Sequence, residues 1–522
     1  MTHAEALYHP ELHDVAAVTA FHAARRPDVP AIICAGRELT YAELHRESNQ
    51  VAHAVQAAGL PPGARVAYLG QESIHYYEVL FGCAKSGTVL VPINFRLAAD
   101  EVQHILRDSG SRLLFVDQDL RAVADKASPS ADLAVVGADP EDFAAWKAPH
   151  PGSDLAPDAG PETPIVQLYT SGTTGLPKGV VLAQRSLFAI RDALASEGLD
   201  WIDWRAGDRS LIGIPGFHVG GVWWAMQGFS AGVTNVAMPR FESAGAVRLV
   251  RELGVTTACV VPSMLRLMLV EPGADHETFA SVRKIVYGGS PISESLLERA
   301  LPVFDCDFAQ IYGLTETGNT AVCLPPADHV PGSPRLRAAG RPYPGVAIKI
   351  IDDAGAELPA GEIGEVCLRT PARMLEYWGL PEATAATLVD GWIHTGDAGY
   401  LDSDGYVYIC DRLKDMIIVG GENIYPTEIE NVLAKHPAVA DVAVIGVPDD
   451  RFGEAVHAFV ALRSGEAARP RDLMVFCRDR IASFKIPSRF EFVDRVPRNP
   501  SGKILRRELR DRFWATRDRR VN

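Results

Sequence analysis

The sequence lacks the features typical of membrane, secreted and nucleic-acid-binding proteins. No uninterrupted apolar run reaches the ~18 residues that a membrane-spanning helix needs, and "ACVVPSMLRLMLV" is broken by Pro262 and Arg266. The first residues, "MTHAEALYHPELHD", contain acids and no apolar core, unlike a secretion signal. The formal charge of −15 argues against general nucleic-acid binding, which needs a basic face. These absences predict a soluble, cytoplasmic protein.

Paired cysteines and the commonest nucleotide-loop motifs are also missing. None of the 8 cysteines lies in a C-x-x-C pair, and in a chain of 522 residues this favours reduced thiols over disulfides or a zinc site. The sequence contains no G-x-x-x-x-G-K-[ST] loop and no G-x-G-x-x-G fingerprint.

One segment departs from the acidic composition. After Val493 the chain is rich in arginine, at Arg495, Arg498, Arg506, Arg507, Arg510, Arg512, Arg517, Arg519 and Arg520. A solvated terminal helix explains this run, and so does a surface that meets an anionic ligand or a membrane. The sequence leaves both readings open.

The pattern of elements predicts an α/β protein of more than one domain, because a single core stops growing at about 250–300 residues. The first third alternates helices such as "TYAELHRESNQVAHAVQAAG" with buried strands such as "RVAYLG" and "TVLVPIN". Thr40 and Glu43 open that helix with a capping-box pattern. Strands separated by helices predict a largely parallel sheet covered on both faces. Residues 124–164 have weak periodicity, and we expect surface structure there.

The pattern changes in the second half of the chain. Between Gly345 and Cys410, "VAIKIID", "GEVCLR" and "YVYIC" predict strands joined by turns, which indicates a β-rich subdomain. After "DRLKD", a helix, two strands and another helix predict a compact α+β unit of about a hundred residues.

The stretch "YTSGTTGLPKGVVLAQRS" concentrates glycines, hydroxyl side chains and one lysine at residues 169–186. Glycines allow backbone N–H groups to approach a ligand, and hydroxyls and Lys178 add donors and positive charge, so the loop suits a phosphate. Taken alone, such a turn is as easily structural.

Six further motifs follow this loop, and together they identify a family resemblance. In order, they are "PGFHVGG", "YGGSPIS", "QIYGLTETG", "GWIHTGDAGY", "DRLKDMIIVGGENIYPTEIE" and "PRNPSGKILRREL". Over nearly its whole length the chain resembles the acyl-adenylate-forming superfamily, in particular its fatty-acyl-CoA and aryl-CoA synthetase branch. The resemblance implies an N-terminal ATP- and acid-binding domain of α/β layers, residues 1–411, with a β-rich subdomain at 345–410. It also implies a hinge at 412–414 and a small mobile α+β domain at 415–522.

The resemblance implies an ATP and AMP site drawn from several motifs. Tyr312 would stack on the adenine, Asp397 would bind the ribose hydroxyls, and Glu316 would hold Mg²⁺. The full set of expected nucleotide contacts is Thr170, Ser171, Gly172, Thr173, Thr174, Gly175, Lys178, Gly288, Gly289, Ser290, Tyr312, Gly313, Thr315, Asp397 and Arg412.

Two further residues are expected to act in catalysis with Glu316. By resemblance, Lys503 would stabilise the negative charge that builds as a carboxylate attacks the α-phosphate. His218 stands where amino-acid-activating relatives tend to carry Asp, which speaks against an amino-acid substrate. For each residue a purely structural role is the alternative.

The remaining expected sites concern the second half-reaction and the acid. Lys414 aligns with the family's hinge residue, and Gly420 and Gly421 would line the pantetheine tunnel. The acyl pocket is expected near Gly220, Trp223 and Trp224, although both tryptophans suit an ordinary core equally well.

The sequence therefore predicts an ATP-dependent acid–CoA ligase that forms an acyl-AMP, releases pyrophosphate and then makes a thioester. ATP, Mg²⁺ and CoA are the implied cofactor and co-substrates, and the acid is a medium-chain, fatty or aryl acid. Transfer to the pantetheine of a carrier protein is the alternative, and a nucleotide-binding protein without catalysis is a further one. A homodimer and peripheral membrane contact remain open.

Overall fold

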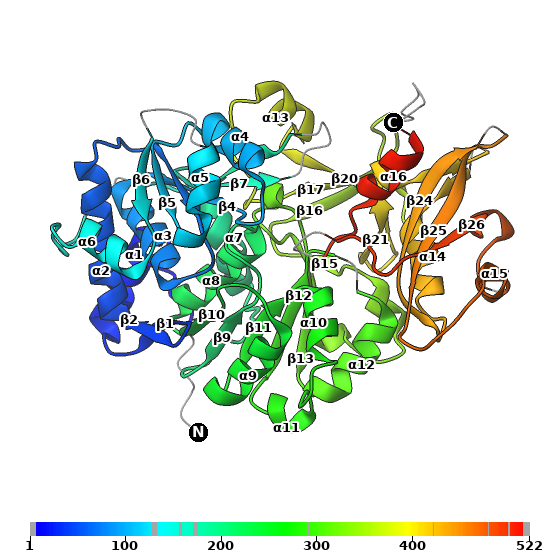
Figure 1. The fold of residues 1–522 in the computed structure, drawn as a ribbon, viewed down its shortest axis with the longest axis horizontal. Coiled ribbons are helices and arrows are strands. Elements are labelled where there is room, and N and C mark those ends of the chain that lie inside the picture. Colours follow the sequence, from blue (N-terminus) through cyan, green and yellow to red (C-terminus); the bar gives the residue numbers. More distant parts are fainter. Residues whose placement is uncertain are drawn as a thin grey trace.

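The computed structural model describes residues 7–127, 133–155, 159–170, 176–290, 292–420, 422–449, 451–478, 480–498 and 502–514. Four sheets organise these residues. The expected mixed α/β class, with a large N-terminal part and a smaller C-terminal part, is confirmed (Figure 1).

Two large sheets form most of the N-terminal part. The first has nine strands in the order β15 (Arg341–Pro342), β14 (Val322–Leu324), β13 (Asp307–Tyr312), β12 (Lys284–Gly288), β11 (Thr257–Val260), β9 (Arg209–Ile212), β10 (Thr234–Ala237), β1 (Pro30–Cys34) and β2 (Arg37–Thr40). The second has seven, in the order β18 (Glu376–Tyr377), β8 (Lys178–Ala183), β7 (Pro164–Thr170), β4 (Val89–Ile93), β3 (Arg65–Leu69), β5 (Leu113–Val116) and β6 (Ala134–Gly137). The strands from β13 to β1 in the first sheet and from β7 to β6 in the second pair in parallel, as the alternating pattern predicts. The remaining pairs of the two sheets are antiparallel.

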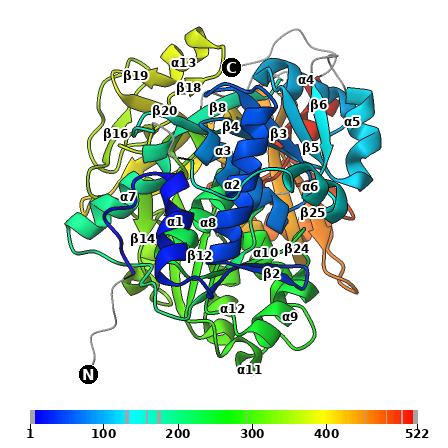
Figure 2. The same ribbon diagram turned by 90° about the vertical axis from the view of Figure 1, so that its left-hand side faces the viewer.

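Helices surround these sheets and join their strands. They are α1 (Val15–Arg25), α2 (Tyr41–Ala57), α3 (Ile74–Ser86), α4 (Ala99–Ser109), α5 (Arg121–Ala127), α6 (Pro140–Lys147), α7 (Gln184–Ser196), α8 (Val219–Ala231), α9 (Ser243–Leu253), α10 (Pro262–Met268), α11 (His276–Phe279) and α12 (Glu294–Phe304). The expected capping box is present, because the Thr40 hydroxyl accepts from the Glu43 amide and the Glu43 carboxylate accepts from the Thr40 amide. Figure 2 shows α1 and α2 on the outer side of the molecule, beside α3.

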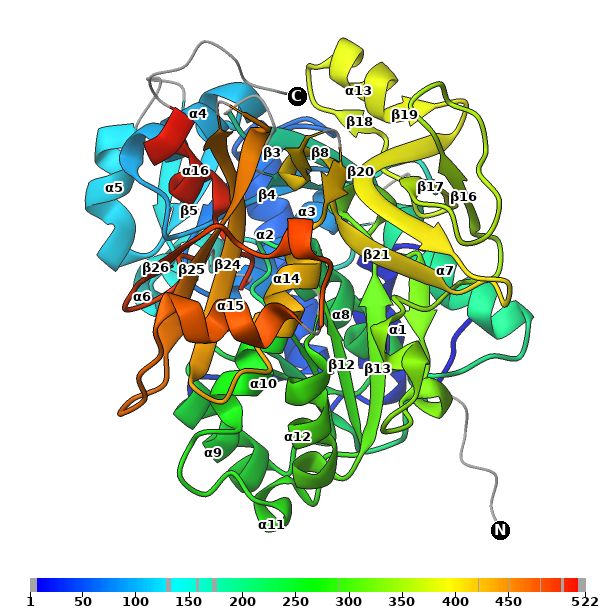
Figure 3. The same cartoon turned by 90° about the vertical axis from the view of Figure 1, so that its right-hand side faces the viewer.

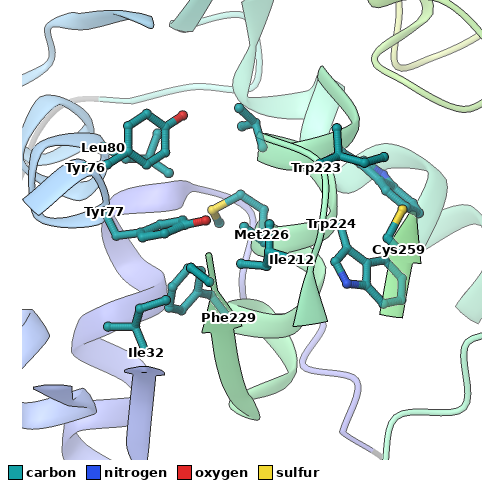
Figure 4. Packing of buried hydrophobic residues seen from close by; sticks show 14 of the residues in the cluster. Ile32, Tyr76, Tyr77, Leu80, Ile212, Trp223, Trp224, Met226, Phe229 and Cys259 are labelled. Carbon is teal, nitrogen blue, oxygen red and sulfur yellow. The ribbon is translucent and has the colours of Figure 1, made fainter. Parts of the chain in front are cut away.

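A single large core joins the two sheets. Its buried side chains come from both sheets and from α3 and α8 between them. Figure 4 shows Tyr77 of α3 facing Phe229 and Met226 of α8, with Ile32 of β1 nearby. The loops that precede α8 and α3 are thereby fixed relative to one another.

The smaller sheets account for the rest of the chain. The third contains β16 (Ala347–Ile351), β17 (Gly364–Arg369), β20 (Trp392–Leu401), β19 (Leu388–Val389) and β21 (Val407–Arg412), with α13 (Pro381–Thr387) beside it. The fourth contains β23 (Glu422–Ile424), β22 (Ile417–Val419), β25 (Gly453–Leu462), β24 (Val439–Asp449) and β26 (Arg489–Phe492). Helices α14 (Pro426–Leu433), α15 (Pro470–Arg478) and α16 (Arg506–Trp514) accompany the fourth sheet (Figure 3).

The region expected as surface structure, residues 124–164, holds regular elements that the sequence did not predict. Strand β6 extends the second sheet in parallel with β5, and α6 follows it. Neither β6 nor α6 shows a clear pattern in the sequence, because the apolar signal is concentrated in few residues. Phe143 is fully buried against Phe115 and Trp146, and so anchors a helix too short to show a clear period.

Within the described residues no helix is long and apolar enough to cross a membrane. The exact position of the domain boundary and of the hinge at 412–414 remains a prediction.

Candidate active site

The glycine-rich loop joins two neighbouring antiparallel strands. Thr170 ends β7 and Lys178 begins β8, and the two residues are direct partners across the pair. The loop therefore leaves and re-enters the sheet at one point. The expected phosphate contacts Ser171, Gly172, Thr173, Thr174 and Gly175 lie outside the described residues.

Lys178 and Glu316 are brought together by a tyrosine. The Lys178 ammonium lies 4.9 Å from the centre of the Tyr377 ring, and the Tyr377 hydroxyl donates to Glu316 Oε1 at 2.6 Å. Tyr377 reaches this place because β18 pairs with β8. The sequence reasoning did not single out Tyr377, and its role becomes visible only in the sheet pairing.

A second cluster links the expected adenine and ribose residues. Tyr312 donates from its hydroxyl to Asp397 Oδ2 at 2.7 Å, and Arg412 Nε lies 2.7 Å from Asp397 Oδ1. Burial raises the pKa of Asp397, although Arg412, Tyr312 and Lys503 act in the opposite direction. A carboxylate offers about four acceptor positions, so Asp397 retains capacity for the hydroxyls of a ribose.

Lys503 of the C-terminal part lies in the same cluster. It interacts electrostatically with Arg412, Asp397, Asp415 and Lys414. Burial, followed by the neighbouring Arg412, lowers the pKa of Lys503 to about 8, while Asp397 counteracts this effect. The structure thus brings a lysine from the end of the chain to the carboxylate expected to hold the ribose.

The glycines expected to form the adenine slot are required by the backbone itself. A Cβ atom at Gly288 would lie 2.5 Å from the Ile311 carbonyl oxygen, and one at Gly313 would lie 2.3 Å from the Asn319 carbonyl oxygen. Gly289 has a φ of +79°. Ser290 follows this turn, and Thr315 begins the 3₁₀ turn that carries Glu316. Glycine here is explained by close strand contact whether or not a base binds.

His218 stands at the start of α8, and one of its ring nitrogens makes no hydrogen bond to the described residues. Its ring is partly exposed, but among the described residues its Nε2 atom is buried and has no hydrogen-bond partner. Burial, assisted by the cation of Arg96, lowers the pKa of His218 to about 4. The imidazole is therefore neutral near pH 7 and able to donate or accept one hydrogen bond.

The loop that carries His218 is held by residues that the sequence reasoning missed. Glu72 Oε2 accepts from the Gly216 amide at 2.8 Å, and Tyr76 donates to the Gly216 carbonyl at 2.9 Å. Tyr77 donates to the other oxygen of Glu72. Burial raises the pKa of Glu72 to about 7. No motif marks these residues, since they meet Gly216 only through the packing of α3 on α8.

The expected acyl-pocket residues differ in their surroundings. Trp223 and Trp224 are buried in the large core (Figure 4). The ring centre of Trp224 lies 5.2 Å from that of Trp204. Burial of this kind fits both the core and the pocket reading, so a role of the two tryptophans in the acyl pocket remains a prediction. Gly220 instead approaches Asn319, whose Nδ2 is buried without a partner among the described residues and whose φ is +94°.

The expected hinge and tunnel residues lie on the C-terminal side of β21. Lys414 is exposed in a 3₁₀ turn, and its carbonyl accepts from Arg510 Nη1 at 3.0 Å. Gly420 has a φ of +60° and donates its amide to the Phe452 carbonyl at 2.8 Å. Gly421 lies outside the described residues. Roles in hinge motion and thiol access remain predictions.

Several arginines of the C-terminal segment make contacts within the chain. Arg506 binds both oxygens of Glu430 at 2.9 and 2.8 Å, Arg512 lies 3.2 Å from Glu491, and Arg498 binds Asp441. For these residues the structure supplies intramolecular partners. Arg517, Arg519 and Arg520 lie outside the described residues.

Comparison with known proteins identifies the family. The family model described as AMP-binding enzyme matches residues 20–378, and the AMP-binding enzyme C-terminal domain matches residues 428–503. The chain is 66% identical over 519 residues to the fatty acid–[acyl-carrier-protein] ligase ScoC of Streptomyces coeruleorubidus, covering 99% of both chains. It is 37% identical over 500 residues to a feruloyl-CoA synthase of Amycolatopsis sp, covering 93% of this chain and 96% of that protein.

A solved structure agrees along the whole fold. The crystal structure of ATP-bound MatB from Rhodopseudomonas palustris superposes with a TM-score of 0.87 at 29% identity. The match covers 95% of this chain and 99% of the other. The sequence predicted an acid–CoA ligase, with transfer to a carrier protein as the alternative. Both activities occur in the names of these relatives.

Proposed function

Because the chain belongs to the AMP-binding enzymes of the acyl-adenylate-forming superfamily and is an ATP-using ligase, we propose that it acts on a fatty acid and an acyl carrier protein. It activates the fatty acid as its acyl-AMP and transfers the acyl group to the pantetheine thiol of the carrier protein. The observation that carries the proposal is the cluster of Tyr312, Asp397, Arg412 and Lys503, into which the C-terminal part delivers its lysine.

In the first half-reaction an oxygen of the acid's carboxylate attacks the α-phosphorus of ATP, and pyrophosphate leaves. Lys503 supplies positive charge where negative charge develops on the phosphate oxygens. Asp397 holds the ribose, and Tyr312 both orients Asp397 and faces the base. Each of these roles fixes the nucleotide relative to the incoming carboxylate.

Glu316 is the residue proposed to hold Mg²⁺. Magnesium takes one or two protein carboxylates together with phosphate oxygens, and the Glu316 carboxylate, which Tyr377 joins to Lys178, fits this pattern. When bound, the ion would neutralise phosphate charge. Tyr377 fixes the carboxylate that would hold it, through the 2.6 Å hydrogen bond.

In the second half-reaction a thiol attacks the acyl carbonyl, loses its proton and displaces AMP. The neutral His218, with its open Nε2, is suited to hydrogen-bond the acyl group at the end of the pocket. The C-terminal part would turn at Lys414, withdraw Lys503 and present Gly420 and Gly421 to the pantetheine.

Two acceptors share this thiol chemistry. The carrier protein is favoured because the relative named a fatty acid–[acyl-carrier-protein] ligase is 66% identical over 99% of the chain. CoA, the acceptor predicted from the sequence, is the second candidate and is favoured by the feruloyl-CoA synthase at 37% identity. The same comparison favours a fatty acid over an aryl acid.

Pyrophosphate release over a panel of acids tests the proposal. The panel contains short, medium and long fatty acids, benzoates, cinnamates and amino acids, each with MgATP and either CoA, a pantetheinylated carrier protein or neither. We expect acid-dependent release that is highest with fatty acids, and a thioester on the carrier. Release with none of these acids, or only with aryl acids, would contradict it.

A further inference from the structure

The turn that carries Lys503 is held by Arg498. Arg498 and Ile504 form a bridge between the two sides of this turn, and Arg498 Nη1 donates to the Gly502 carbonyl at 2.6 Å. The Leu505 amide donates to the Pro497 carbonyl at 2.9 Å. The guanidinium thus fixes the peptide immediately before Lys503.

Arg498 is in turn oriented by a carboxylate from another element. Asp441 on β24 accepts from Arg498 Nη2 at 2.8 Å and from Arg498 Nε at 3.0 Å. A paired arginine–carboxylate contact sets direction as well as distance, because both hydrogen bonds must align. Asp441 therefore determines where Arg498 holds the Gly502 carbonyl.

The same carboxylate faces the N-terminal part of the molecule. Arg266 on α10 lies with Nη1 at 3.7 Å from Asp441 Oδ1. Gly502 is buried with a φ of +78°, and a Cβ there would lie 2.3 Å from Ser263 Oγ on the same helix. Helix α10, seen below the C-terminal sheet in Figure 3, therefore meets both the turn and the carboxylate that supports it.

This support matters because Lys503 stands in an unfavourable place for a cation. It is partly buried beside Arg412, and both circumstances disfavour its charge. A lysine on a free turn would move toward solvent, where its charge is better stabilised. Fixing the preceding peptide keeps the ammonium where the first half-reaction needs it.

We propose that Asp441 is a positioning residue for adenylation, which holds the Lys503 turn through Arg498 and links it to α10 through Arg266. The link exists in the arrangement in which Lys503 meets Asp397 and Arg412, so it acts on the first half-reaction. The inference rests on the adenylation step of the proposed function and is independent of the acceptor.

Separate assays of the two half-reactions distinguish positioning from general stability. Pyrophosphate release is measured with a fatty acid and MgATP, and thioester formation with supplied acyl-AMP and either CoA or carrier protein. We expect Asp441→Asn to slow pyrophosphate release on the order of tenfold to a hundredfold, the usual effect of a misplaced catalytic group. Thioester formation from acyl-AMP should keep the wild-type rate.

A second variant avoids the interior of the C-terminal part. Arg266→Asp on α10 places a carboxylate beside Asp441, and the like charges oppose docking of the turn. Pyrophosphate release should fall roughly tenfold, and thioester formation should stay unchanged or become faster. The melting temperature Tm should stay at the wild-type value, because Arg266 is partly exposed.

Lys435→Gln is the matched control. It removes another ion pair between the two parts, Lys435 to Glu294 at 3.0 Å, without touching the Lys503 turn. We expect wild-type pyrophosphate release. Equal loss of both half-reactions in Asp441→Asn, or equal losses in Arg266→Asp and Lys435→Gln, would overturn the inference. If the wild-type enzyme releases pyrophosphate but forms no thioester with either acceptor, the proposed thioester step is contradicted and the adenylation step is not. Pyrophosphate release alone then decides between the variants.

Discussion

At the scale of single residues, the site is defined by two partly buried cations placed beside the buried carboxylate of Asp397. Asp397 is buried, accepts from Tyr312 and pairs with Arg412, and Lys503 joins them from the far end of the chain. Sequence motifs name these residues but give no protonation state. Burial supplies that information, because it disfavours charge on Asp397 and Lys503 alike.

The lowered pKa of Lys503 predicts the alkaline limit of adenylation. Below about pH 8 the ammonium is charged and stabilises the phosphate oxygens, and above it the neutral amine does not. The kcat/KM for pyrophosphate release, which reports the free enzyme, should fall as pH rises through about 8. In Lys503→Arg this limb should vanish, because arginine stays charged. If kcat/KM still falls through about pH 8 in that variant, another group causes the alkaline decrease.

Glu72 predicts a pH dependence of stability. Burial raises its pKa to about 7 from an ordinary value of 4.5, so between these values the folded protein holds a proton that the unfolded chain has released. Its contribution is complete below pH 4.5 and is lost as pH rises to about 7, by roughly 3 kcal/mol. The wild type should therefore lose more Tm than Glu72→Gln between pH 5 and pH 8. Parallel losses would exclude this role for Glu72.

At the scale of elements, regular local patterns were predictable and long-range pairings were not. The helix opened by Thr40 was predicted because its capping box lies within four residues. Helix α6 was missed because one buried side chain, Phe143, anchors it. Tyr377 reaches Glu316 only because β18 pairs with β8, which no local pattern indicates. The two tryptophans stayed ambiguous because burial in a core and burial in a pocket look alike in sequence.

The pairing of β18 with β8 predicts a specific effect on the metal requirement. Tyr377→Phe keeps the ring beside Lys178 but removes the hydroxyl that orients Glu316. The Mg²⁺ concentration for half-maximal pyrophosphate release should rise about tenfold, as is usual when a supporting hydrogen bond to a ligand is lost. Tyr406→Phe, which loses a similar 2.8 Å hydrogen bond to Asp328, is the control and should need the wild-type concentration. Equal requirements in both variants would remove Glu316 from the proposed metal site.

At the scale of the whole molecule, the two parts meet around Lys503 and are joined near Lys414. The small and large parts each have their own buried clusters, so a turn between them leaves both cores intact. Arg510 holds the Lys414 carbonyl, and Arg506 approaches Asp411 and Asp415 on either side of it. The mixed α/β class was predictable from element order, whereas these contacts depend on how the parts dock.

Lys414→Pro should separate the two half-reactions. Proline fixes φ near about −65°, which suits the present 3₁₀ turn and restricts rotation. Pyrophosphate release should stay within roughly the wild-type range while thioester formation from supplied acyl-AMP falls by about a hundredfold. The assay pair is the one used for Asp441→Asn, with the opposite expected outcome. Equal loss of both activities would place the hinge elsewhere.

The most direct test of the central claim is a competition in one tube. The enzyme receives a fatty acid, MgATP, and equal concentrations of CoA and pantetheinylated carrier protein, and intact-protein and small-molecule mass spectrometry follow both products over time. The account predicts that the acyl group appears first and mainly as a thioester on the carrier, with AMP and pyrophosphate formed in equal amounts. Accumulation of acyl-CoA with an unloaded carrier would contradict the proposed acceptor, and thioester formation without AMP would contradict the adenylate mechanism.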